Sequence, residues 1–287
     1  AWRGFVDRLL LWLGGLTLAC SVLFFIAYNW ADMGRFFRFG LVEGALVAAI
    51  AAYWKTAGRG MAAQVSLMVA TLLLGVLLAL FGQVYQTGAD PWQLFFYWAL
   101  LMTPWALIGR SAVLWVFWLT LINLAVLLYY QAWGGIFGAL FGLDFSALWL
   151  LFLFNTGALV LWELGAGRWT WLAVSWPKRL LALGSGLPIT LLALFAISDY
   201  RQVSGAALVV YPLWLSVLYV AYRKLVADLF MLAGGCLSVM AVIIYFLGEA
   251  LSLYSEPGGL LVLALLILGL SAVAVVWLKR VHGELGS

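Results

Sequence analysis

Glu43 is the one acidic side chain that falls clearly inside an apolar run, between Arg38 and Lys55. At a helical rise of about 1.5 Å per residue, it would lie roughly 5 Å outward of the midpoint of a membrane span. A carboxylate at that depth must be paired, protonated or facing a hydrated cavity, so it is a candidate functional group. Two interpretations stay open. Glu43 could carry a proton, because desolvation disfavours its charged form, or it could form a structural pair with Arg38 or Arg35.

A second candidate is the segment 82–92, Gly-Gln-Val-Tyr-Gln-Thr-Gly-Ala-Asp-Pro-Trp, at the outer end of another apolar run. Pro91 disfavours helical geometry at Asp90, so the segment predicts a helix end followed by a helix that Asp90 caps. Amide and phenol groups at membrane depth are costly unless they are paired. The cluster could therefore hold helices together or form a ligand site at the outer mouth. Its candidate residues are Gln83, Tyr85, Gln86 and Asp90.

Three asparagines complete the polar candidates: Asn29 after the first apolar run, Asn123 in the fifth and Asn155 at the centre of the sixth. Each alone is more typical of an interhelical hydrogen bond than of a binding site. Together with Glu43 and Gln83 they could line one cavity.

Other chemistry is largely missing from the sequence. The single histidine, His282, follows the last apolar run, and the two cysteines form no CxxC motif, so no metal site or disulfide is expected. We find no HExxH, GxSxG or Walker motif, and therefore no catalytic residue and no cofactor to predict. The sequence suggests no enzymatic reaction.

The elements that must position these residues are membrane helices. The chain is 67% hydrophobic and only 9% charged, which excludes an ordinary soluble domain. A helix needs about 20 apolar residues to cross a bilayer. We expect an all-α polytopic bundle of about ten transmembrane helices in a single membrane domain, with spans near 8–28, 36–54, 62–82, 92–109, 111–130, 145–164, 178–198, 203–222, 226–247 and 258–278.

Charge segregation supports this count. When the gaps between spans are assigned alternately to two faces, one face collects 12 of the 15 Lys and Arg residues, and the other collects most of the acids. Short loops rich in Lys and Arg stay cytoplasmic, so both termini are predicted to be cytoplasmic. The apolar segment 131–144 on the outer face is expected to be re-entrant or interfacial. A pI near 9.1 is explained by these helix-end anchors rather than by nucleic-acid binding.

Several of these motifs resemble a bacterial family of predicted membrane proteins of unknown function. The shared features are Ala-Tyr-Asn-Trp at 27–30, Gly-Gln-Val-Tyr-Gln at 82–86, Asp-Pro-Trp at 90–92, Trp98 and Pro104. The resemblance covers about residues 10–130. It implies the bacterial cytoplasmic (inner) membrane and brings no known activity.

Three functional hypotheses follow. The first is a small permease or lipid-handling transporter, with Glu43 as the coupling acid and residues 83–90 gating the outer side. The second is a non-transporting structural or accessory subunit of an envelope complex. The third is a membrane-embedded enzyme acting on a lipid-linked substrate. Membrane lipids are the expected partners, with an envelope protein under the second hypothesis, and the sequence does not determine the oligomeric state.

Overall fold

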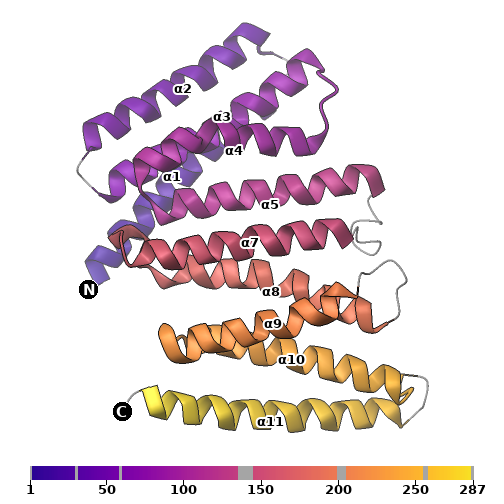
Figure 1. Ribbon diagram of the computed structural model, residues 1–287. Helices are drawn as coiled ribbons and strands as arrows, with labels where there is room; N and C mark the ends of the chain where they lie inside the picture. The colour runs from indigo at the N-terminus through magenta and orange to yellow at the C-terminus, as the bar shows by residue number, and fades with distance from the viewer. Residues whose placement is uncertain are drawn as a thin grey trace. The chain divides into compact units, whose positions relative to one another are not determined.

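The computed structural model describes residues 2–29, 32–57, 60–134, 145–198, 205–254 and 258–285. Within these ranges every regular element is helical (Figure 1), which confirms the predicted all-α class. The helices are α1 (Trp2–Tyr28), α2 (Arg35–Thr56), α3 (Met61–Tyr85), α4 (Pro91–Gly109), α5 (Ala112–Gly134), α7 (Phe145–Ala166), α8 (Ser175–Ile197), α9 (Ala206–Val220), α10 (Leu229–Ala250) and α11 (Gly259–Leu285). The expected re-entrant segment 131–144 lies almost entirely outside the described residues.

Nine helices of the described chain are long and apolar enough to cross a membrane, and α4 is the exception. Its 19 residues reach about 28 Å, close to the thickness of a bilayer core. Its apolar character is diluted by Gln93, two prolines and three tryptophans. Since α4 nevertheless packs along α3 and α5, the chain is a membrane-embedded bundle of helices.

The chain divides into two compact units, unit 1 (residues 1–139) and unit 2 (residues 140–287). In unit 1, α3 is the central helix and contacts α1, α2 and α4, while α4 also packs along α5. The prediction that the whole chain forms one membrane domain stays a prediction.

Tryptophan side chains join the central helices of unit 1. The Trp98 Nε1 atom of α4 donates a 2.8 Å hydrogen bond to the backbone oxygen of Thr71 in α3. Trp118 of α5 donates in the same way to the backbone oxygen of Ala99, at 3.0 Å. Each indole therefore buries its ring in a helix contact while its N–H is satisfied by a helical carbonyl.

In unit 2, α7 packs along α8, and α8 in turn contacts α9 and α10. Helix α11 lies against α10. The close approach of α7 and α8 depends on a residue without a side chain, because a β-carbon on Gly184 would come within 2.8 Å of the Asn155 Oδ1 atom. A short 3₁₀ turn (Thr170–Leu172) connects α7 to α8, and a π-helical turn (Ala221–Leu225) continues α9.

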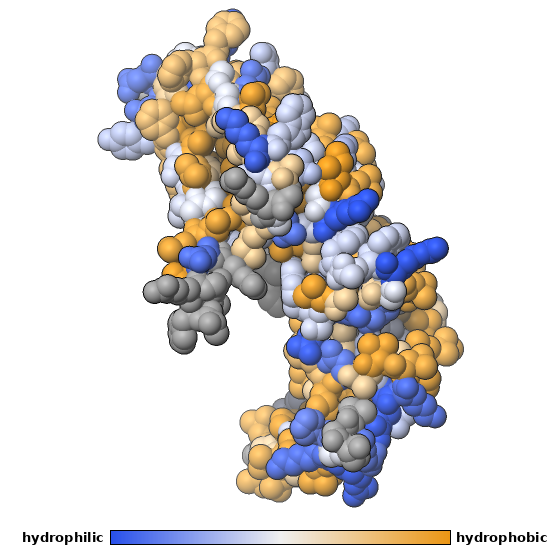
Figure 2. Space-filling model, turned by 90° about the vertical axis from the view of Figure 1, so that its left-hand side faces the viewer, coloured by the Kyte–Doolittle hydropathy of each residue, from blue (hydrophilic) through white to orange (hydrophobic). Residues whose placement is uncertain are grey.

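One end of unit 2 collects its described basic residues. Ion pairs and hydrogen bonds there join the end of α7, the start of α8, the π-helical turn after α9, the start of α10 and the end of α11. We call this the basic end. It lies at the left of Figure 1, and Figure 2, which looks onto that side, shows hydrophilic side chains among hydrophobic ones.

Candidate functional site

The structure places Glu43 on the exposed side of α2. No hydrogen bond or ion pair joins its carboxylate to another described residue, so neither predicted arginine partner is used. Gly40 and Gly44, its neighbours on the helix, also have open space where a β-carbon would stand. Glu43 lines neither of the two apolar pockets described below.

The predicted cluster at the end of α3 has the expected backbone and different side-chain contacts. Gln86 ends the helix in the left-handed conformation, and its N–H bonds to the backbone oxygen of Gly82. Asp90 occupies the N-cap position of α4, but its side chain makes no capping hydrogen bond. Gln83, Gln86 and Asp90 are exposed. Tyr85 is also exposed, and its ring centre lies 6.0 Å from that of Phe39, so it contacts α2.

Each asparagine side chain donates a hydrogen bond to the backbone four residues earlier. The side-chain amide of Asn29 donates to the backbone oxygen of Phe25, and Asn123 and Asn155 donate to the residues four positions earlier. Asn155 is buried. Since Asn155 belongs to unit 2 and the others to unit 1, their convergence in one cavity stays a prediction.

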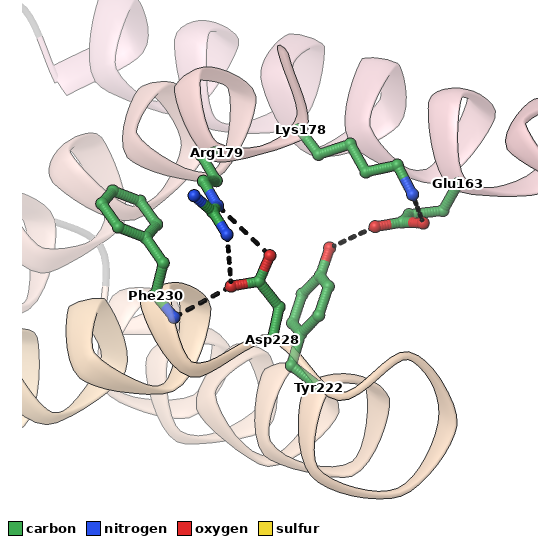
Figure 3. Close-up of polar contacts among 6 residues, drawn as sticks. All are labelled: Glu163, Lys178, Arg179, Tyr222, Asp228 and Phe230. Carbon is green, nitrogen blue, oxygen red and sulfur yellow. Dashed lines mark hydrogen bonds and ion pairs between the residues drawn. The ribbon is translucent and has the colours of Figure 1, made fainter. Parts of the chain in front are cut away.

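A group of charged side chains that the structure brings together lies at the basic end of unit 2 (Figure 3). The Lys178 ammonium of α8 is 2.6 Å from Glu163 Oε2 of α7. The other carboxylate oxygen, Oε1, accepts a 3.0 Å hydrogen bond from the Tyr222 hydroxyl. The side chains of Lys178 and Glu163 are only 12% and 20% exposed. The carboxylate therefore ties α7 to α8 and to the turn after α9.

A second ion pair lies beside it. Arg179 donates from Nε and Nη2 to the two carboxylate oxygens of Asp228, at 3.2 and 3.4 Å. Asp228 also caps α10, because its Oδ1 accepts a 2.9 Å bond from the Phe230 N–H. The Arg179 guanidinium stands 5.2 Å from the centre of the Phe230 ring, as a cation–π contact.

Sequence reasoning did not single out this ionic group. A signal was available: Glu163, Asp228 and Glu284 are acids on the face where nearly all Lys and Arg residues gather. The structure pairs each of them, the third with Arg223. These three acidic residues, which lie among basic helix ends in the sequence, therefore each form an ion pair between two elements of the fold.

An apolar pocket begins next to Arg179. The α8/α10 pocket, of about 250 Å³, opens between α8 and α10 and has Trp214 and Leu218 of α9 among its walls. Along α10 it extends from Phe230 to Ala241, about 16 Å at the helical rise. Thr190 and Ser238 are the hydroxyl residues that line it. Their oxygens are 2.6 Å apart, and the Tyr211 hydroxyl is 2.9 Å from that of Ser238.

A second apolar pocket, the α9/α11 pocket, has a volume of about 360 Å³. It lies between α9, α10 and α11, and Cys236, Ala274 and Trp277 are among its walls. Gly235 and Leu218 border both pockets. In the described part of the chain no three His, Cys, Asp or Glu side chains are grouped to hold a metal ion. The two pockets can thus accept apolar ligands.

A family described as "Predicted membrane protein (DUF2157)" matches residues 3–115. The match covers α1 to α4 and the start of α5, so the expected resemblance to predicted membrane proteins of unknown function is confirmed for that part of the chain, while the motif within it stays a prediction. No curated protein and no solved structure matches the chain. Both pockets and the ionic group lie beyond the matched residues.

Proposed function

We propose that the protein handles membrane lipid, and that unit 2 holds a lipid acyl chain in the α8/α10 pocket. The observation that carries the proposal is the place and lining of this pocket. It runs along the half of α10 nearest the basic end, and its walls are apolar except for Thr190 and Ser238.

The surroundings of the pocket favour an acyl chain as its occupant. A length of about 16 Å corresponds to one leaflet of a hydrocarbon core that is about 30 Å thick. Leu183, Leu187 and Leu237 line the pocket and are also exposed, which favours an opening toward the lipid of a bilayer. Binding sites for apolar ligands are typically concave and apolar, with few polar groups. The neighbours available to fill this one in a bilayer are lipid chains.

The proposal takes the lipid-handling form of the transport hypothesis rather than a solute permease. A permease for a polar solute needs polar groups that converge in a hydrated cavity, whereas the two pockets described above have almost entirely apolar walls and include none of the predicted polar residues. If the basic end is cytoplasmic, as the charge pattern predicts, the bound chain belongs to the cytoplasmic leaflet of a bacterial inner membrane.

Gly234 allows a direct test. It lines the pocket, and a β-carbon there would meet no atom within 4 Å, so Gly234→Leu can add an isobutyl group at the pocket without a clash at its first atom. The matched control is Gly157→Leu in α7, which also has open space and lines neither pocket. After purification in mild detergent, native mass spectrometry should show bound lipid on the wild type and Gly157→Leu, and less on Gly234→Leu. Equal lipid on all three proteins would refute the proposal.

A further inference from the structure

Ala182 of α8 and Phe230 of α10 are the residues of the α8/α10 pocket that lie nearest the basic end. Arg179 precedes Ala182 by one turn of α8 and lies over the Phe230 ring. A chain in the pocket would therefore present its polar end next to this guanidinium.

Arg179 has hydrogen-bonding capacity to spare. A guanidinium carries five N–H donors, and two of them bond to Asp228, which leaves three. The side chain is 42% exposed, whereas that of Asp228 is 15% exposed. Asp228 is also committed to the cap of α10. The cation of this pair is thus accessible at the surface beside the pocket, and the anion is largely enclosed.

We propose that Arg179 recognises the phosphodiester of an anionic phospholipid whose acyl chain occupies the α8/α10 pocket. The inference rests on the proposed lipid-handling function and adds the class of headgroup. Arginine matches the geometry of phosphate oxygens with its planar fork of donors. The pair also sets the strength of binding, because the Asp228 carboxylate neutralises the guanidinium and repels an approaching phosphate.

Two substitutions in this pair have opposite expected effects. Arg179→Gln removes the cation and should lower the affinity for phosphatidylglycerol at least about tenfold, the lower end of the range for one hydrogen bond to a charged group. Asp228→Asn removes the competing charge but keeps a side-chain oxygen that can cap α10. It should raise the affinity for phosphatidylglycerol. A purely structural ion pair would weaken binding in both variants.

The measurement is native mass spectrometry of the full chain with added phosphatidylglycerol or phosphatidylcholine of the same acyl chains. The wild type should prefer phosphatidylglycerol, and Arg179→Gln should lose the preference. Arg168→Gln, which removes an exposed arginine of the same end, should keep it.

Excess inorganic phosphate should not displace the lipid, and displacement would instead indicate a site for soluble phosphate. A preference that survives Arg179→Gln, or weaker phosphatidylglycerol binding by Asp228→Asn, would overturn the inference. Lipid loss in Gly234→Leu together with an unchanged preference in Arg179→Gln would overturn it while leaving the proposed function standing.

Discussion

The indole ring of Trp98 lies directly against Gly75, where α4 crosses α3. A β-carbon on Gly75 would come within 2.3 to 2.5 Å of three ring atoms. The same indole donates its hydrogen bond to the backbone of Thr71, one turn earlier on α3. The ring can reach that carbonyl because residue 75 has no side chain.

Gly75→Ala should therefore destabilise unit 1. The added methyl group must displace the Trp98 ring and weaken its hydrogen bond, and overpacking of this kind costs about 1–3 kcal/mol. The check is the thermal unfolding of the purified protein in detergent. Gly44→Ala in α2, where the β-carbon meets no neighbour, should unfold at or slightly above the wild-type temperature, because alanine is the better helix former. An equal loss in both variants would contradict the role of the Trp98 contact.

The helices of unit 1 could be predicted because apolar runs of the required length are visible in the sequence, whereas their contacts could not. The contact of Trp98 with Gly75 is one example, because it depends on how α3 and α4 cross. The polar cluster from Gln83 to Asp90 also shows that backbone geometry can be predicted more easily than side-chain contacts. Pro91 and Gly88 determine the backbone locally, while the exposure of the side chains depends on how neighbouring helices end.

Glu163 should contribute to the stability of unit 2 through its two partners. Glu163→Gln keeps the size of the side chain but leaves the largely buried Lys178 ammonium without a counter-charge. A cost of about 1–3 kcal/mol is expected for a hydrogen-bonded charge pair of this burial. Glu284→Gln, which breaks an ion pair whose acid is 52% exposed, should cost at most about 1 kcal/mol.

A double-mutant cycle separates the pair from its surroundings. Lys178→Met combined with Glu163→Gln should cost less than the sum of the two single changes, since the double variant leaves no uncompensated charge. Thermal or chemical unfolding of the four proteins measures this coupling. Strict additivity would show that Glu163 and Lys178 stabilise the protein independently.

Glu43→Gln should leave thermal stability within about 0.5 kcal/mol of the wild type, the range of surface substitutions. The reason is that the Glu43 carboxylate is exposed and has no partner among the described residues. A larger loss in the same unfolding assay would mean that another group pairs with Glu43 in the membrane. The sequence could locate Glu43 within a membrane span, because the apolar residues on both sides of it define the span. It could not tell which way the acid faces, because that depends on the packing of α2.

The α9/α11 pocket carries a reporter of its own, because Cys236 lines it and the chain has only one other cysteine, Cys20. In a Cys20→Ala background, a small membrane-permeant maleimide should label Cys236 only by entering the pocket. Ala274→Phe fills part of the pocket and should slow labelling several-fold, in line with the steric control of thiol access.

The matched control is Ala272→Phe, since Ala272 is an exposed residue of the same helix that does not line the pocket. Mass spectrometry of the intact protein gives the labelled fraction over time. Equal slowing by both phenylalanines would mean that the reagent reaches Cys236 by a route other than the pocket. Slowing by Ala274→Phe alone would establish that the reagent reaches Cys236 through the α9/α11 pocket, and that a small molecule can enter unit 2 between these helices.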